Sequence, residues 1–350
     1  MLKVDTMIIG SGQAGCRLAS AYREKFEYDE NNVLLFNTAS DDAMAKLTLL
    51  QEGGQYEGSG RNPLVTLEKI VPPNTSVIKH KIREILNRRV KTVILFNSMG
   101  GGSGSAINYH IMKDILIPHT NTPINIVCII VFPFAAEGNP CNSNALAMLN
   151  MYYSLCNDIT IIPVENDIAY ERGVSNTFDK TNEKISNQIN MMINYDNFVG
   201  EPKVGGIGTL DKREFSRIIA PSGGFLLYTT LHGKFEADAI ESKLSSFGAN
   251  RGKSMIMLFR TLDNTIVDMS LLNKINGMFP EQLKIIAESR GKSGGMSIDV
   301  LTNGVPIPEK FSHRADEVIA KVDELKARRE KDKKASRDII KKGLRSLINI

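Results

Sequence analysis

Five apolar runs recur along the first half of the chain, and a glycine-rich turn or a helical pattern follows each of them. The runs span residues 4–9, 33–36, 92–96, 124–132 and 159–164. Short buried strands that alternate with helical segments are typical of a parallel sheet with helices on both faces. The pattern therefore predicts an α/β fold with a doubly wound, mostly parallel sheet, and a ligand site at the carboxyl ends of its strands.

The second half of the chain has a different organisation. Residues 176–198 contain no Gly or Pro, which predicts one long central helix. A glycine-rich loop, a short helix from Asp211, and apolar runs at 224–230 and 254–260 then predict a smaller α/β second domain. A charged segment with an apolar stripe predicts a C-terminal helix. We expect a first domain over 1–175, the central helix over 176–198, the second domain over 199–308, and a C-terminal helix with a basic tail over 309–350.

Charge is concentrated at the end of the chain. The formal net charge is +4, and residues 309–350 alone carry 13 Lys and Arg against 8 Asp and Glu. The rest of the chain is therefore close to neutral, and the tail is where a nucleic-acid-bound or acidic partner would dock. Direct DNA binding stays open, although the interspersed acids dilute the positive field.

The four cysteines lie in or beside apolar runs and form no C-x-x-C pair, which predicts buried, reduced thiols rather than metal ligands. The longest apolar run, 124–136, contains Pro133 and is too short to cross a bilayer. Both features predict a cytoplasmic protein that does not span a membrane.

The first candidate site is Gly10-Ser11-Gly12-Gln13-Ala14-Gly15, a G-x-G-x-x-G motif between a strand and a helix. Small residues here let backbone N–H groups and the helix N-terminus approach an anion. The motif alone would also fit a Rossmann-type NAD oxidoreductase. However, the second strand ends in Asn37-Thr38, where that fold usually places an acidic residue for the ribose.

A second glycine-rich turn, Gly100-Gly101-Gly102-Ser103-Gly104-Ser105, follows the strand 92–96 and opens another helix. A second glycine-rich loop of this kind is not expected in a Rossmann dehydrogenase. The sequence also contains no G-x-x-x-x-G-K-[ST] motif, which disfavours a P-loop NTPase. The pair of loops predicts a nucleotide site in which backbone dipoles, rather than a lysine, hold the phosphates.

These motifs resemble those of the tubulin and FtsZ superfamily of polymer-forming GTPases. GGGSGS is similar to its phosphate loop, and residues 58–63 resemble the loop near its γ-phosphate. Phe132-Pro133-Phe134 with Glu137-Gly138 resembles a segment near the ribose, and residues 12–15 are close to the GQCG of tubulin. The resemblance implies a tubulin/FtsZ fold that binds GTP or GDP with Mg²⁺, with 1–175 as the GTPase domain.

The resemblance also assigns individual nucleotide contacts. Phe178 and Asn182 are four residues apart and so share one helix face, where the ring would stack on the base and the amide would read guanine. The full set implied is Gly12, Gln13, Ala14, Cys16, Gly60, Arg61, Asn62, Gly101, Gly102, Ser103, Gly104, Ser105, Glu137, Asn166, Phe178 and Asn182.

Residues 210–214 resemble the catalytic loop that FtsZ writes as L-D-x-x-D. In that family the loop enters the nucleotide pocket of the next subunit, so Asp211 and Glu214 would activate water only after head-to-tail assembly. Two acids in the first turn of a helix are also ordinary complements of the helix macrodipole, and this alternative stays open.

The basic tail resembles that of the TubZ group, which forms filaments that segregate plasmid or phage DNA. It implies a DNA-binding adaptor of the TubR type, bound to centromeric DNA, as the partner of the tail. The alternatives are a phage tubulin-like filament of the PhuZ type and, from another class, the NAD oxidoreductase. Two departures stand out: Ala106 replaces a usual glycine, and residues 139–141 lack an arginine that FtsZ offers to the nucleotide.

Overall fold

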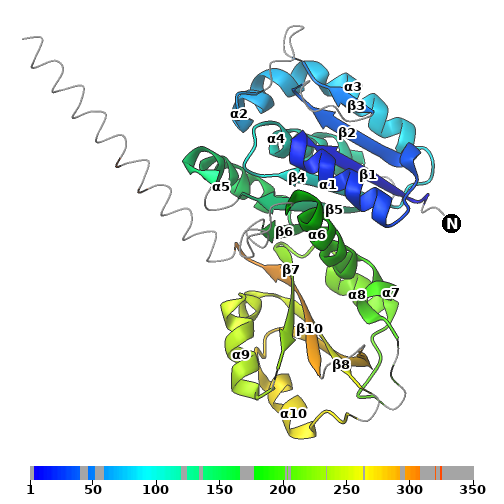
Figure 1. Ribbon diagram of the computed structural model, residues 1–350, viewed down its shortest axis with the longest axis vertical. Coiled ribbons are helices and arrows are strands. Elements are labelled where there is room, and N and C mark those ends of the chain that lie inside the picture. The colour runs from blue at the N-terminus through cyan, green and yellow to red at the C-terminus, as the bar shows by residue number, and fades with distance from the viewer. Residues whose placement is uncertain are drawn as a thin grey trace, which may run out of the picture.

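The fold is a single twisted sheet that runs through two lobes (Figure 1). The computed structural model describes residues 4–39, 46–51, 59–119, 124–133, 137–165, 177–201, 203, 206–233, 235–262, 265–291, 296–307, 320 and 324. Apart from positions 320 and 324, the C-terminal helix and basic tail expected over 309–350 lie outside these residues.

Ten strands of the described chain form the sheet, in the order β3-β2-β1-β4-β5-β6-β7-β10-β8-β9. The first six are parallel, as predicted. The second lobe joins them through the pairing of Ile161 with Phe225 and is mixed, because β10 is antiparallel to both β7 and β8. The strands are β1 Thr6–Ser11, β2 Val33–Asn37, β3 Leu47–Leu49, β4 Thr92–Ser98, β5 Asn125–Phe132, β6 Thr160–Glu165, β7 Phe225–His232, β8 Ser254–Thr261, β9 Leu283–Arg290 and β10 Ser297–Val305.

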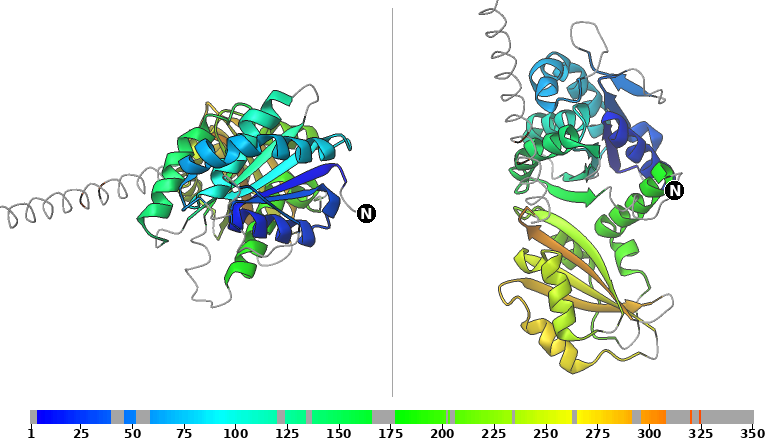
Figure 2. Two further views of the ribbon diagram at one scale, coloured as in Figure 1. Left: turned by 90° about the horizontal axis from the view of Figure 1, so that it is seen from above. Right: turned by 60° about the vertical axis from the view of Figure 1, so that its left-hand side comes forward.

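Helices cover both faces of the sheet (Figure 2). In the first lobe they are α1 Gly12–Lys25, α2 Pro63–Val65, α3 Val71–Leu86, α4 Ser103–His110 and α5 Asn139–Tyr153. Later in the chain come α6 Thr177–Ile193, α7 Tyr195–Val199, α8 Lys212–Ile219, α9 Ala237–Ser246 and α10 Met269–Gly277. Short π-helical segments, Thr66–Ile70 and Ile111–Leu116, join α2 to α3 and extend α4, and 3₁₀ turns occur at Glu30–Asn32, Ile117–His119 and Ala249–Arg251.

Alternate strand residues build two hydrophobic cores, one on each face of the sheet. Ile9 of β1 faces a core shared with α3, α4 and α5, whereas its neighbour Ile8 faces a core shared with α1 and α6. Strands buried on both faces need continuous apolar sequence, which is why these runs do not alternate with polar residues. All four cysteines are free and buried, and burial raises the pKa of the Cys156 thiol to about 12.

The helix expected over 176–198 is two helices. α6 ends at Ile193, and Asn194 adopts an extended conformation with φ −115° and ψ 112°. Its side chain accepts hydrogen bonds from the N–H groups of Asp196 (3.1 Å) and Asn197 (3.3 Å) and so starts α7. Asn competes for backbone donors and is a strong helix N-cap, which the absence of Gly and Pro did not reveal.

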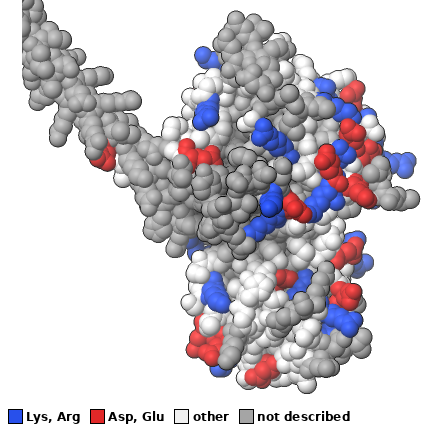
Figure 3. Space-filling view, in the orientation of Figure 1, with Lys and Arg blue, Asp and Glu red and all other residues white. Residues whose placement is uncertain are grey.

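Within the described ranges, no helix is long and apolar enough to cross a membrane. On the face drawn in Figure 3, Lys and Arg side chains are interspersed with Asp and Glu over the upper lobe. The described part of this face therefore carries no broad surface of a single charge.

A buried ion pair joins the second lobe to α7. Arg260 Nε donates to Asp299 Oδ2 at 2.7 Å, and these side chains are only 15% and 7% exposed. The same guanidinium donates to the carbonyl oxygens of Val199 (2.7 Å) and Phe198, which end α7. The turn after the central helix is thus held by a side chain of the second lobe.

We expect Arg260→Met to lower the free energy of unfolding by about 3–5 kcal/mol, because it leaves Asp299 buried without its cation. Arg290→Met is the matched control, because the Arg290–Glu201 pair is exposed and 3.7 Å long. Chemical denaturation followed by circular dichroism measures both. Equal losses in the two variants would contradict this account of the α7 junction.

Candidate functional site

The two glycine-rich loops touch at the carboxyl edge of the parallel strands. Gly12 begins α1 with φ +70°, and a Cβ there would lie 2.9 Å from the Cα atom of Gly104. A Cβ on Gly104 would in turn lie 2.6 Å from the carbonyl oxygen of Ser11. Only glycine allows this approach, so the β1–α1 and β4–α4 turns form one surface.

A third loop, residues 59–62, lies against the same surface. A Cβ on Gly102 would clash with Ser59 Oγ and lie 2.5 Å from the Asn62 nitrogen. Gly60 and Arg61 both have left-handed backbones, with φ of 58° and 59°. This conformation is strained for an arginine and persists only where the surroundings hold it.

Asn144 of α5 supplies part of that support. Its side-chain nitrogen donates to the carbonyl oxygen of Arg61 and, at 3.1 Å, to that of Gly100. Asn62 also fixes the loop, because its side chain accepts from the N–H of Leu64 at 3.0 Å and caps α2. Asn144 therefore links the 59–62 loop to the glycine-rich loop before α4, and Asn62 fixes the end of the 59–62 loop.

Hydroxyl groups gather between these loops. Ser103 Oγ lies 2.6 Å from Thr38 Oγ1 and 3.4 Å from Ser59 Oγ. Ser105 is buried and donates to the carbonyl oxygen of Gly101 at 3.5 Å, so it closes the loop instead of facing outward. The Tyr152 hydroxyl of α5 donates a 2.6 Å hydrogen bond to the carbonyl oxygen of Ser105 and so fixes this residue's backbone.

The electrostatics of this edge favour an anion. α1, α4 and α5 all begin here, and none has a side-chain cap or an acidic residue in its first turn. Their first N–H groups and the positive ends of their dipoles are therefore directed at one region. A Cβ on Gly60 or on Gly101 would meet no heavy atom within 4 Å, so there is open space beside the loops. The arrangement fits phosphate groups.

The other residues expected around the nucleotide divide into three groups. Gln13 and Ala14 are exposed at the start of α1, and Glu137 is exposed just after β5. Asn182 is half-buried near the start of α6. Asn166 and the side chain of Phe178 lie outside the described residues.

Cys16 takes a different direction from its neighbours. Its side chain is 1% exposed, belongs to the core between α1 and the sheet, and donates to the carbonyl oxygens of Gly10 (3.4 Å) and Phe36 (3.5 Å). Its thiol therefore faces away from the loops.

Asp211 and Glu214 form a capping box at the start of α8. Asp211 Oδ1 accepts from the N–H groups of Arg213 (2.7 Å) and Glu214 (2.8 Å), and the Asp211 N–H donates to Glu214 Oε2 at 3.1 Å. The two acids therefore stabilise the start of the helix by hydrogen bonds, beyond the complement of its macrodipole that their position suggested. Both bonds to Asp211 use Oδ1, so Oδ2 is available for a second role.

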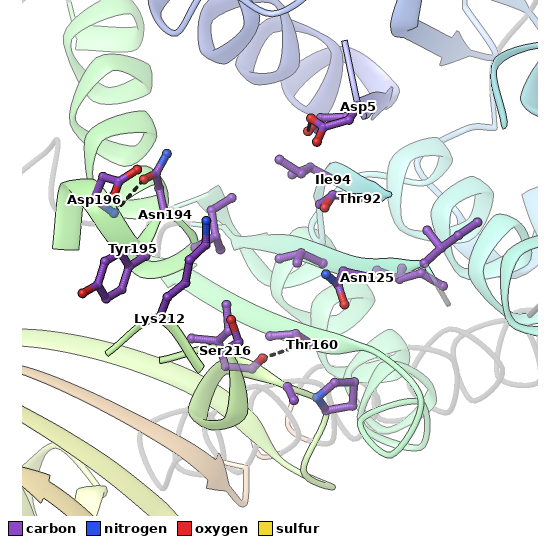
Figure 4. Close-up of a pocket in the computed structure, with 18 of the residues that line it drawn as sticks. Asp5, Thr92, Ile94, Asn125, Thr160, Asn194, Tyr195, Asp196, Lys212 and Ser216 are labelled. Atoms are coloured by element: carbon purple, nitrogen blue, oxygen red, sulfur yellow. Dashed lines mark hydrogen bonds between the residues drawn. The ribbon is translucent and has the colours of Figure 1, made fainter. Parts of the chain in front are cut away.

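This helix start lies at the opposite edge of the sheet. A cavity of about 360 Å³ lies there, and its lining includes Lys212 from α8, Asp196 from α7, and Asp5, Thr92 and Asn125 at the amino ends of the strands (Figure 4). β1, β4 and β5 contain six, seven and eight residues, at about 3.3 Å each, so roughly 20 Å or more separates the two edges. No side chain spans that distance within one chain.

No protein-family model and no curated protein matches the sequence. Solved structures do match. One is the GTPγS-form protofilament of TubZ from Bacillus thuringiensis serovar israelensis, with a TM-score of 0.70 and 16% identity over 93% of this chain and 94% of that chain. A second is the GTPγS-bound protofilament of CetZ2 from Haloferax volcanii, with a TM-score of 0.66 and 20% identity over 91% of this chain and 99% of that chain. A third is CetZ from Methanosaeta thermophila strain DSM 6194, with a TM-score of 0.61 and 17% identity over 97% of each chain.

The chain has the tubulin/FtsZ fold. The fold class expected from the sequence is thereby confirmed. In this structure the three loops and the α8 capping box occupy opposite edges of one sheet.

Sequence reasoning missed the residues that support the site from a distance. Asn144 is 83 residues from Arg61, and Tyr152 is 47 residues from Ser105. Tyr195 of α7 donates to the carbonyl oxygen of Leu210 at 2.6 Å, just before the capping box. An isolated Asn or Tyr in a helix pattern carries no local signal of such contacts.

We expect Gly102→Ala to lower the free energy of unfolding by about 1–3 kcal/mol, because the new methyl group is forced against Ser59 and Asn62. Gly101→Ala is the matched control, since its methyl group enters open space. Thermal melts compare the two. Equal stability of the variants would mean that the 59–62 loop does not pack on the glycine loop as described.

Proposed function

We propose that the chain binds GTP or GDP at the carboxyl edge of the first lobe and hydrolyses GTP in a head-to-tail filament. The three convergent loops would hold the phosphates through backbone N–H groups, with the Ser103 and Thr38 hydroxyls beside them. Similarity to TubZ and CetZ structures that contain GTPγS supports a guanine nucleotide.

The base would lie against the start of α6. Asn182 is half-buried there and would donate to or accept from the guanine edge, with the Phe178 ring stacked on the base. Gln13 and Ala14 at the start of α1 and Glu137 after β5 would line the remaining sides. Arg61 is exposed and has a left-handed backbone conformation, and its side chain would contribute a positive charge next to the phosphates.

Mg²⁺ fits this site as an ion bound mainly through the nucleotide. Among the described residues, no group of three His, Cys, Asp or Glu side chains is placed to hold a metal. Mg²⁺ commonly keeps several waters and binds through substrate phosphates, so hydroxyls such as Ser103 would complete its shell. When bound, it would neutralise charge on the phosphates.

One observation supports the assembly mechanism. The three loops that would hold the phosphates and the Asp211–Glu214 capping box lie at opposite ends of the strands, roughly 20 Å or more apart. A site that needs both must combine the carboxyl edge of one copy with the amino edge of the next. Asp211 Oδ2 of the second copy would then orient a water molecule and accept its proton. The water oxygen forms a bond to the γ-phosphorus while the bond to the β–γ bridging oxygen breaks, leaving GDP and phosphate.

For the cellular role, we propose a cytoplasmic filament that moves plasmid or phage DNA. The support is the basic tail at 309–350 and the similarity to TubZ, whose known structures include two-stranded and four-stranded filaments. The tail would bind an adaptor of the TubR type on centromeric DNA. A phage-positioning filament of the PhuZ type is the nearest alternative and would share the nucleotide chemistry.

The test separates the two roles of Asp211. Asn is as good an N-cap as Asp, so Asp211→Asn keeps the helix start but removes the carboxylate. We expect it to polymerise with GTP and to release phosphate about 100-fold more slowly per polymerised subunit, as loss of a general base predicts. Phosphate release and light scattering are recorded together across a protein concentration series, with GTP and with ATP.

The wild-type protein should hydrolyse GTP, and not ATP, only above a critical concentration. Lys113→Gln, on the π-helical segment after α4, is a control that leaves both edges intact. Turnover that stays constant per subunit at all concentrations would rule out the shared site, and NADH binding would then test the oxidoreductase alternative.

A further inference from the structure

A buried ion pair fastens the segment before Asp211 to the second lobe. Lys203 Nζ lies 2.7 Å from Glu288 Oε1, and these side chains are only 7% and 3% exposed. Lys203 also donates to Thr261 Oγ1 (2.9 Å) and to the carbonyl oxygen of Thr265 (2.6 Å), and Thr261 donates to Glu288. Burial alone would raise the pKa of Glu288, but the hydrogen bonds from Lys203 and Thr261 outweigh it and lower the pKa.

Glu288 holds the segment with both its side chain and its backbone. Its Oε2 accepts from the Ile207 N–H at 3.1 Å, and its own N–H donates to the Gly208 carbonyl oxygen at 3.0 Å. β9 is an edge strand of the sheet, so residues 206–208 lie along its free side. A Cβ on Gly206 would come within 3.0 Å of Glu288 Oε2, which shows how closely the segment is packed.

The next residues are fixed from the other side. Tyr195 OH donates to the Leu210 carbonyl oxygen at 2.6 Å, and the capping box then sets Asp211 itself. The chain from 206 to 211 therefore runs between two fixed supports, β9 of the second lobe and α7.

We propose that Glu288, paired with Lys203, is the positioning residue that sets where Asp211 stands for hydrolysis in the neighbouring copy. This inference rests on the proposed function. A buried ion pair is a weak source of net stability, because desolvation offsets most of its attraction. It does fix geometry, and a displacement of about 1 Å at a reacting group costs on the order of 100-fold in rate.

A matched pair of glycine variants gives the sharpest test. Gly206→Ala pushes a methyl group against Glu288 Oε2 without removing any buried charge, so we expect this variant to fold. Gly208→Ala is two residues closer to Asp211, yet its methyl group would meet only the Ile286 carbonyl oxygen at 3.7 Å, an ordinary contact. Glu288→Gln removes the charge itself, and Glu201→Gln is its control in an exposed ion pair.

The full-length protein is assembled with GTP, sedimented, and its phosphate release is divided by the amount of polymer. We expect Gly206→Ala and Glu288→Gln to lower turnover per polymerised subunit about 10-fold or more, with critical concentrations within about twofold of wild type. Gly208→Ala and Glu201→Gln should match wild type. Equal turnover in Gly206→Ala and Gly208→Ala overturns the inference. If Glu288→Gln does not fold, the comparison of these two glycine variants is the deciding test.

Hydrogen exchange on the unassembled protein separates this inference from the proposed function. In Gly206→Ala and Glu288→Gln, the amides of Ile207, Asp211 and Arg213 should exchange about 10-fold faster than in the two controls. If wild type shows no assembly-linked turnover, the proposed function fails. The role of Glu288 in holding Asp211 is tested separately, by the exchange rates of these amides. Unchanged exchange in Glu288→Gln overturns that role.

Discussion

Close contact between two glycine-rich turns is the constraint on which the site depends. Gly12 and Gly104 bring the backbones of the β1–α1 and β4–α4 turns together, and Gly102 lets the 59–62 loop lie on top of them. A side chain at any of these positions would separate the loops. The contact also brings the uncapped N-termini of α1 and α4 to one region, and the positive ends of helix dipoles placed together in this way favour an anion.

The sheet then separates these three loops from the capping box that begins α8. Asp211 is a structural residue in a single chain, since its Oδ1 satisfies two backbone donors. Its second oxygen is what a neighbouring copy would use. In the proposed mechanism the same residue would cap the helix and act on water, and a substitution can remove its charge while keeping the cap.

Hydrogen bonds from the second lobe hold α7 and the segment before Asp211 in place. Arg260 holds the end of α7, Tyr195 of α7 holds Leu210, and Glu288 holds residues 207 and 208. Charged groups buried between the lobe and the segment resist displacement better than apolar contacts, because a shift would leave them unpaired in a dry environment. The lobe thus gives the segment before Asp211 a rigid support.

The sequence by itself determined the parallel sheet, the central helix position, and the loops that carry Gly12, Gly102 and Asp211. These features follow from local patterns: buried strands are apolar without interruption, and turns that approach one another need glycine. Local patterns also left the role of Asp211 open between a complement of the helix macrodipole and a catalytic group. Only the tertiary structure decided that the cap exists, that α6 ends at Asn194, and that the thiol of Cys16 faces the core. It alone placed Asn144 and Glu288, which act on backbone groups about 80 residues away in the chain. Contacts of that separation depend on how the sheet is ordered and twisted, and no single stretch of sequence encodes them.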